Sequence, residues 1–166
     1  GNLKILPNSG KQIIVSTTRA FDEPLNSQRV LFRERNRFHA WEGGHHISNS
    51  SVLASSLEVD HKGNIHAIWL DNSVKNCTRA IYRRRRFNQK HSKDVDFERQ
   101  IIVSNAAFCK SNAHVHPAIH LLRPDSLVYL WVDQASDPHS LLGHRLVYAL
   151  SHSFADKTRV QWLAPQ

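Results

Sequence analysis

Two aspartates close Trp-x-Asp units that lie 62 residues apart, at Asp71 and at Asp133. A carboxylate at the end of an apolar segment can cap a loop by accepting hydrogen bonds from backbone N–H groups. It can also act as a catalytic acid or base when it lies in a cleft. The pattern favours the capping role and leaves the catalytic one open.

Other side chains in similar positions could bind a ligand. Arg29, Arg79 and Arg145 each open an apolar segment of the same kind, and guanidinium groups match carboxylates through two parallel hydrogen bonds. His114 and His116 alternate, so both would lie on one face of a strand. A metal site needs third and fourth ligands, whose spacing is not visible, and ordinary loop histidines are the favoured interpretation. The sequence therefore predicts no metal and no cofactor.

Four consecutive arginines, Arg83 to Arg86, form the densest charge of the chain. Such a run is typical of phosphate- or sulfate-binding surfaces. Successive residues of a strand point to opposite faces, so half of the run can face one ligand. It could extend into a basic stripe on an outer wall with three further arginines: Arg33, Arg35 and Arg37. A solvated outer face is the favoured interpretation.

The residues around the first Trp-x-Asp unit predict a β-hairpin over 57–71. Apolar and polar residues alternate on both sides of Gly63-Asn64, which is the pattern of two strands joined by a tight turn. The same pattern returns, without a gap, at 119–133. The segments at 11–17 and 127–133 carry large apolar residues on both faces, which predicts strands with a sheet packed on each side.

The whole chain divides into three copies of a four-stranded unit, at about 1–49, 50–105 and 106–166. The first copy has predicted strands at 3–6, 11–17, 28–34 and 38–48, the last with a kink at Gly43-Gly44. The second has strands at 57–59, 65–71, 79–86 and 97–104, and the third at 118–122, 127–133, 145–151 and 158–163. Consecutive units of four strands are typical of β-propeller blades.

The hairpin pattern D-x-x-G-N-I-H-x-x-W-x-D, the following I-Y-x-R and the closing I-I-V-S resemble the repeats of sialidase-like, or BNR-type, β-propellers. The resemblance implies an all-β fold, a six-bladed ring of which this chain is half, and binding of glycans. It also makes Arg29, Arg79 and Arg145 comparable to the arginines that hold a substrate carboxylate in sialidases. The strict Asp-box spacing of true sialidases is absent, and third strands lie far from a propeller axis, so a structural role for these arginines is favoured.

Three blades leave two uncovered faces, which predicts pairing with a second copy or with a sister fragment of the same precursor. Trp69 and Trp131 are predicted to lie in the core between blades. A Trp131→Ala change would then weaken pairing along with stability.

Cys77 and Cys109 fall in neighbouring connections at one rim, where a disulfide is sterically feasible. The alternative is two unpaired thiols. Asn49 and Asn76 begin N-x-S/T sequons, which point to glycosylation and a secreted protein. No apolar run reaches the length of a transmembrane span, and Gly1 in place of Met indicates a processed start.

The net charge of +8 favours an anionic partner. The sequence thus predicts a recognition module that binds an acidic glycan. Two alternatives remain: a fragment of a glycoside hydrolase that is active in the complete propeller, and a structural subunit whose basic face meets RNA or a membrane. A hydrolase needs two carboxylates in one cleft.

Overall fold

The computed structural model describes residues 2–7, 10–18, 28–35, 38–74, 77–87, 97–109, 117–134, 144–152 and 160–166. Every regular element in these ranges is a β-strand. The predicted all-β class is confirmed. Since these residues form no helix, no helix among them could span a membrane.

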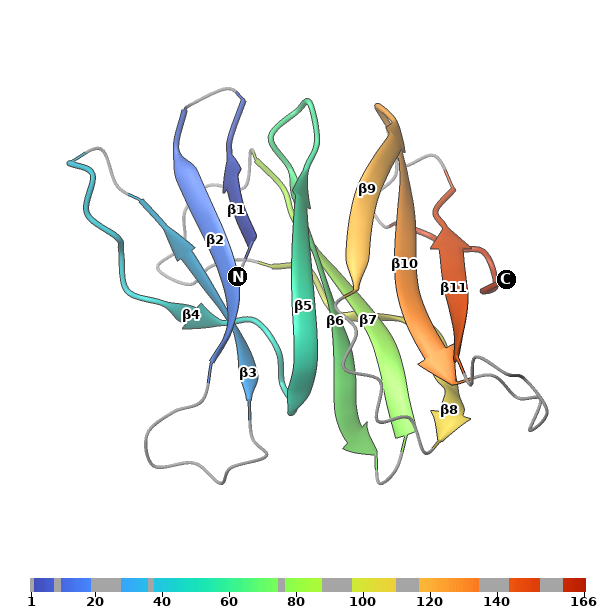
Figure 1. Cartoon of the computed structure of the whole chain (residues 1–166). Helices are drawn as coiled ribbons and strands as arrows, with labels where there is room; N and C mark the ends of the chain where they lie inside the picture. Colours follow the sequence, from blue (N-terminus) through green and yellow to red (C-terminus); the bar gives the residue numbers. More distant parts are fainter. Residues whose placement is uncertain are drawn as a thin grey trace.

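The strands form three antiparallel sheets that follow one another along the chain (Figure 1). The first sheet has the order β1-β2-β3-β4, with bounds Asn2–Ile5, Gln12–Thr18, Arg29–Glu34 and His45–His46. The second has the order β5-β6-β7-β8, with bounds Val52–Val59, Ile65–Val74, Cys77–Arg85 and Ile101–Cys109. The third has the order β11-β10-β9, with bounds Ala118–Arg123 for β9, Ser126–Gln134 for β10 and His144–Leu150 for β11.

Four predicted strands depart most from the observed ones. The strand predicted at 97–104 is β8, which begins at Ile101 and ends at Cys109. The predicted strand 38–48 is reduced to the two residues of β4, with one further bridge between Arg35 and Trp41. The strand predicted at 57–59 is β5, which begins at Val52. Of the predicted strand 158–163, the described residues 160–163 form no regular strand. In its place, residues 160–166 run beside β11 through backbone hydrogen bonds and a bridge between Ser151 and Trp162.

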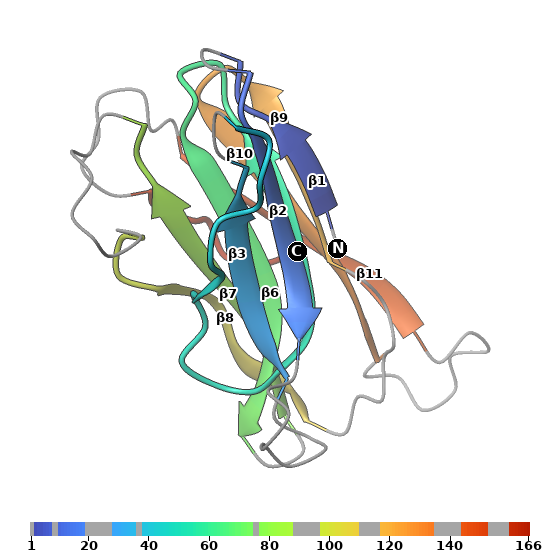
Figure 2. The same cartoon turned by 90° about the vertical axis from the view of Figure 1, so that its left-hand side faces the viewer.

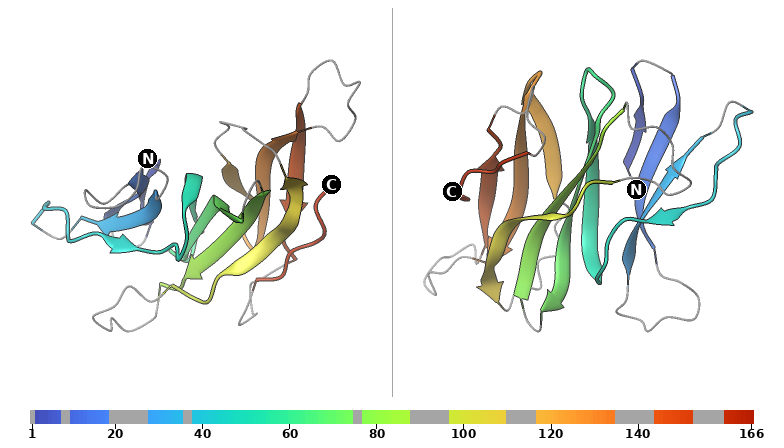
Figure 3. Two further views of the ribbon diagram at one scale, coloured as in Figure 1. Left: turned by 90° about the horizontal axis from the view of Figure 1, so that it is seen from below. Right: turned by 180° about the vertical axis from the view of Figure 1, so that it is seen from behind.

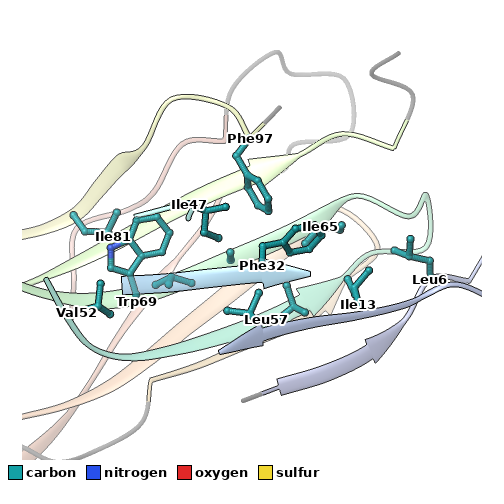
Figure 4. Close-up of a cluster of buried hydrophobic side chains, with 13 residues drawn as sticks. Leu6, Ile13, Phe32, Ile47, Val52, Leu57, Ile65, Trp69, Ile81 and Phe97 are labelled. Atoms are coloured by element: carbon teal, nitrogen blue, oxygen red, sulfur yellow. The ribbon is translucent and has the colours of Figure 1, made fainter. Parts of the chain in front are cut away.

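The second sheet is covered on both faces. Alternate residues of β6 point to opposite sides, so Ala67 and Trp69 face the first sheet while Ile68 and Leu70 face the third. Figure 3 shows the three sheets in a row, with the second in the middle. Figure 4 shows the apolar cluster between the first and second sheets, with Trp69 and Phe32 inside it.

The second cluster joins the second and third sheets. It contains Tyr82, Tyr129 and Trp131, and Tyr129 donates its hydroxyl to the Trp69 carbonyl at 2.9 Å. Trp69 is fully buried and Trp131 is 3% exposed. The prediction that both tryptophans lie in the core between sheets is confirmed.

The first strands of the three sheets lie beside one another (Figures 1 and 2). Strand β5 contacts β1 on one side and β9 on the other. Glu58 of β5 binds Lys4 of β1 at 3.0 Å and approaches Nδ1 of His120 of β9 at 3.5 Å. A row of polar side chains, Lys4, Glu58 and His120, therefore crosses all three sheets along their first strands.

Candidate functional site

Asp71 is enclosed and already paired. Its side chain is 1% exposed, and Oδ2 accepts hydrogen bonds from Nη2 of Arg79 and from Oγ of Ser50, both at 2.8 Å. Arg79 lies directly opposite Asp71 in the register of β6 and β7. The carboxylate therefore ties the middle of the second sheet to the segment that enters it, which is a structural role.

In two of the three copies, the register places an aspartate opposite the arginine that opens the third strand. Asp133 lies directly opposite Arg145, as Asp71 lies opposite Arg79. In the first sheet Arg29 lies opposite Thr18. The three arginines belong to three different sheets, each facing the end of its own second strand.

The other predicted ligand residues are not brought into one described site. His114 and His116 lie outside the described residues. His45 and His46 are exposed in β4, and Asn49 is exposed just after it, where a glycan could be attached. Within the described part of the chain, no three His, Cys, Asp or Glu side chains gather as a metal site would require.

Cys77 and Cys109 lie directly opposite each other at the ends of β7 and β8. Directly opposed residues of an antiparallel pair have Cα atoms about 4.5–5.5 Å apart, which lies within the range that a disulfide spans. The backbone therefore permits the predicted bridge, across one strand pair rather than between two connections.

Peptide mapping tests this bridge. Digestion of the native protein without reductant should give one linked peptide pair that contains Cys77 and Cys109, and reduction should separate it. Recovery of both peptides as free thiols under non-reducing conditions would show that the opposed cysteines do not bridge.

The arginine run is largely buried, contrary to the predicted solvated face. Arg83 donates to the carbonyls of Ile47, Phe97 and Glu98 at 2.6–2.9 Å, and burial lowers its pKa. Arg84 is 3% exposed and binds Glu98 at 2.8 Å. The run therefore fastens β7 to the segments on either side of it.

A small cavity opens between the hairpin turns of the first and second sheets. Its volume is about 210 Å³. Its lining comes from the turn between β1 and β2, the end of β3, the turn between β5 and β6, and the end of β7. The lining residues are Leu6, Lys11, Glu34, Gly63, Ile65, Arg85, Arg86 and Phe87. Pockets for whole drug-sized ligands are typically about 300–1,000 Å³, so this one suits a single group of a larger ligand.

The lining of this pocket is positively charged. It carries three cations, Lys11, Arg85 and Arg86, against one carboxylate, Glu34. Arg85 binds Glu34 at 2.6 Å and lies over the ring of Phe32. The Arg86 side chain binds Glu98 at 2.7 Å and remains 38% exposed. Arg85 and Arg86 are thus held in place by carboxylate partners, and the lining carries more cations than carboxylates.

Gly63 shapes the aromatic side of the pocket. Its φ of +83° is a left-handed conformation that favours glycine, and a Cβ at this position would lie 2.9 Å from the ring of Phe87. Phe87 also donates its backbone N–H to Oδ1 of Asn64. The turn and the Phe87 ring therefore pack tightly, and the ring stays 43% exposed beside the cations.

A buried polar chain that the sequence reasoning missed lies below the same turn. Asp60 accepts hydrogen bonds from the backbone N–H groups of Lys62 and Asn64 and from the side chain of Asn64. His66 joins Asp60 at 3.3 Å through Nε2 and Tyr82 at 2.8 Å through Nδ1. All three side chains are at most 1% exposed.

The protonation states of this chain follow from its burial. Burial lowers the pKa of His66 more than the hydrogen bond and charge of Asp60 raise it, so the ring is neutral at pH 7. Burial raises the pKa of Tyr82 well above its usual range, so its hydroxyl stays protonated. An ionised Asp60 only accepts hydrogen bonds, so Nε2–H of the neutral His66 ring donates to Asp60, and Nδ1 accepts from the Tyr82 hydroxyl. Burial pushes the pKa of Asp60 upward, but hydrogen bonds from His66 and Asn64 outweigh it and hold the pKa below its ordinary value.

Comparisons with known proteins add no family. No protein-family model matches the chain, and no curated protein matches it. The likeness to sialidase-like repeats therefore rests on the hairpin, I-Y-x-R and I-I-V-S patterns.

Proposed function

We propose that the three sheets are consecutive blades of a sialidase-like β-propeller, and that the chain acts as a recognition module for acidic glycans. Two features support the blade arrangement. Equivalent first strands lie beside one another, with Lys4, Glu58 and His120 in a row along them. Each pair of successive sheets also packs face to face through an apolar cluster.

The observation that carries the binding proposal is the cationic pocket between the first two sheets. Three cations and one carboxylate line it, so a carboxylate or sulfate group would meet a favourable charge there. The exposed ring of Phe87 and the side chains of Leu6 and Ile65 supply apolar surface beside those charges. A small pocket with few polar groups and an apolar wall is typical of sites that fix the orientation of one chemical group.

The pocket supports binding better than hydrolysis. Glycoside hydrolysis uses two carboxylates that flank the scissile bond. Glu34 is the single carboxylate among the described lining residues, and Arg85 already holds it. Asp71 is the predicted carboxylate whose side chain the structure describes, and it is enclosed by Arg79 and Ser50. The alternative of a basic face for RNA loses its main support, because Arg83, Arg84 and Arg85 bind partners within the fold.

Calorimetric titration with a sialylated and with a sulfated oligosaccharide tests this function. Arg86→Ala removes one exposed pocket cation while Glu98 keeps Arg84 as its partner. A charged hydrogen bond contributes roughly 1.5–3 kcal/mol, so we expect affinity to fall about ten-fold or more. Binding should also weaken steeply as salt is raised.

The matched control is Arg123→Ala, which removes the same charge from an exposed position at the end of β9. It should leave the affinity nearly unchanged. Equal losses of affinity in both variants would show that binding depends on the overall charge of the protein rather than on the pocket. Absence of binding to both oligosaccharides at millimolar concentration would contradict the proposal. Release of free sugar during the titration would favour the hydrolase instead.

A further inference from the structure

The third sheet exposes positions that the second sheet buries. Ala80 and Tyr82 of β7 correspond to Leu146 and Tyr148 of β11, since each pair follows the opening arginine at the same spacing. Ala80 is 2% exposed and Tyr82 is fully buried under the third sheet. Leu146 is 64% exposed and Tyr148 is 39% exposed. The outer face of the third sheet therefore has the residues of a contact between sheets, and no sheet of the described residues covers it.

The first sheet shows the same feature on its opposite face. Leu3, Leu57 and Ile119 occupy equivalent positions in the first strands of the three sheets. Their partners on the second strands are Ile14, Ala67 and Tyr129. Each partner lies four residues before the residue that pairs with the opening arginine. Leu57 is 1% exposed and Ile119 is 2% exposed, whereas Leu3 is 54% exposed. Ile5, further along β1, is 61% exposed. Leu57 and Ile119 lie against the preceding sheet, and the first sheet has no such neighbour among the described residues.

We propose that a second copy of this chain covers both faces, and that two copies close a six-bladed ring. This inference rests on the proposed blade arrangement. Within one copy, the outer face of each of the first two sheets packs against the next sheet along the chain. The outer face of the third sheet would pack in the same way against the exposed face of the first sheet of a second copy. A two-fold axis then makes the contact twice, with the third sheet of each copy on the first sheet of the other.

The number of blades and the chemistry of the faces agree with a ring of two copies. Closed propellers have about four to eight blades, and two sets of three lie within this range. Leu146 and Tyr148 share one face of β11, and Leu3 and Ile5 share one face of β1, because residues two positions apart in a strand point the same way. Adjacent exposed apolar side chains of this kind can mark an interaction surface. Each new contact would resemble the two contacts that already join the sheets within one chain, which are rich in aliphatic and aromatic side chains.

Light scattering of the full chain at micromolar concentration should give twice the 19.0 kDa mass of one copy. Leu146→Asp and Leu3→Asp each place a charge in one of the two faces, so each should weaken pairing by about thirty-fold or more. Both positions are exposed within one copy, so circular dichroism should show that the variants remain folded. Leu53→Asp is the matched control: Leu53 is 39% exposed but belongs to the second sheet, and its variant should pair normally.

A mixture of the two weakened variants is the sharper test. In a mixed ring one of the two contacts is unaltered, so the mixture should pair more tightly than either variant alone. Loss of pairing in one variant but not in the other would show that like faces meet, and would overturn the ring. A monomer at micromolar concentration would also overturn it.

The two proposals fail in different ways. The cationic pocket lies within one copy, between the first and second sheets. A monomer that still binds an acidic oligosaccharide would therefore overturn pairing alone, whereas a dimer that binds none would overturn the binding function alone.

Discussion

Replacement of Trp131 by alanine is expected to lower the free energy of unfolding by about 3–5 kcal/mol. Trp131 is 3% exposed, and its ring meets the edge of Tyr129 at a centroid distance of 5.0 Å. Tyr129 in turn donates to the carbonyl of Trp69 in the second sheet. Removal of the indole leaves a void between the second and third sheets, which close packing cannot fill without moving a strand.

Urea denaturation measures this loss, and Trp41→Ala is the matched control. Trp41 is 42% exposed in the connection between β3 and β4, so its removal should cost about 1 kcal/mol or less. Similar losses in the two variants would show that the contact between the second and third sheets does not limit stability.

The position of Trp131 also corrects the predicted effect on pairing. Trp131 lies on the face of β10 that meets the second sheet, while the outer face of the third sheet carries Leu146 and Tyr148. Its replacement is therefore expected to act on the stability of each copy. Pairing should respond instead to changes at Leu146 and Leu3.

The hairpins were predictable because their pattern is local. Alternation on both faces of β6 and a glycine in its turn are visible within fifteen residues, and the structure has the strands where that pattern places them. The short β4 was not predictable. Apolar residues between 38 and 48 suggest a longer strand, but β3 pairs only with His45 and His46 in β4. Register with β3, which the sequence does not show, decides how much of the segment belongs to the sheet.

The arginine run was misinterpreted because its partners are distant in the sequence. Arg85 binds Glu34, 51 positions away, and Arg84 binds Glu98, 14 positions away. Alternate arginines point to opposite faces of β7, so one run serves two sheet contacts. A sequence shows four like charges in a row, whereas in the fold Arg85 binds Glu34, Arg84 and Arg86 share Glu98, and Arg83 binds backbone carbonyls.

The chain of Asp60, His66 and Tyr82 was missed for a related reason. Asp60 and His66 are both visible in the D-x-x-G-N-I-H hairpin pattern, where the aspartate would be assigned to the turn alone. Tyr82 comes from the next strand and reaches His66 diagonally across the sheet. The signal that could have identified the buried chain was His66 itself, which shares one face of β6 with the apolar Ile68 and Leu70.

This buried chain predicts that the protein loses stability in mild acid. The pKa of His66 lies below its ordinary value of about 6.5 in the folded state, because burial disfavours the charged ring. Below pH 6.5 the unfolded chain therefore binds a proton at this residue that the folded chain does not. The stability from neutral His66 is complete above pH 6.5 and is lost as the pH falls from there toward the folded pKa.

The groups around His66 set the size and limits of the effect. Asp60 and Glu58 favour the charged ring, while Arg84 opposes it and Tyr82 donates to the unprotonated nitrogen. One proton gives a slope of at most about 1.4 kcal/mol per pH unit. The pKa of Asp60 is also depressed, so its own contribution is present above the ordinary pKa of about 4 and is lost at lower pH.

Urea titrations between pH 7.5 and pH 5 separate His66 from the other histidines. His66→Gln keeps an amide that can bind both Asp60 and Tyr82 but does not titrate, so this variant should have a smaller slope below pH 6.5 than the unaltered chain. His61→Gln changes an exposed histidine of the same turn and should keep the original slope. Equal slopes for the unaltered chain and His66→Gln would show that the buried ring is not the acid-sensitive group. A slope difference confined to His66→Gln would assign the acid sensitivity to the ring beneath the cationic pocket.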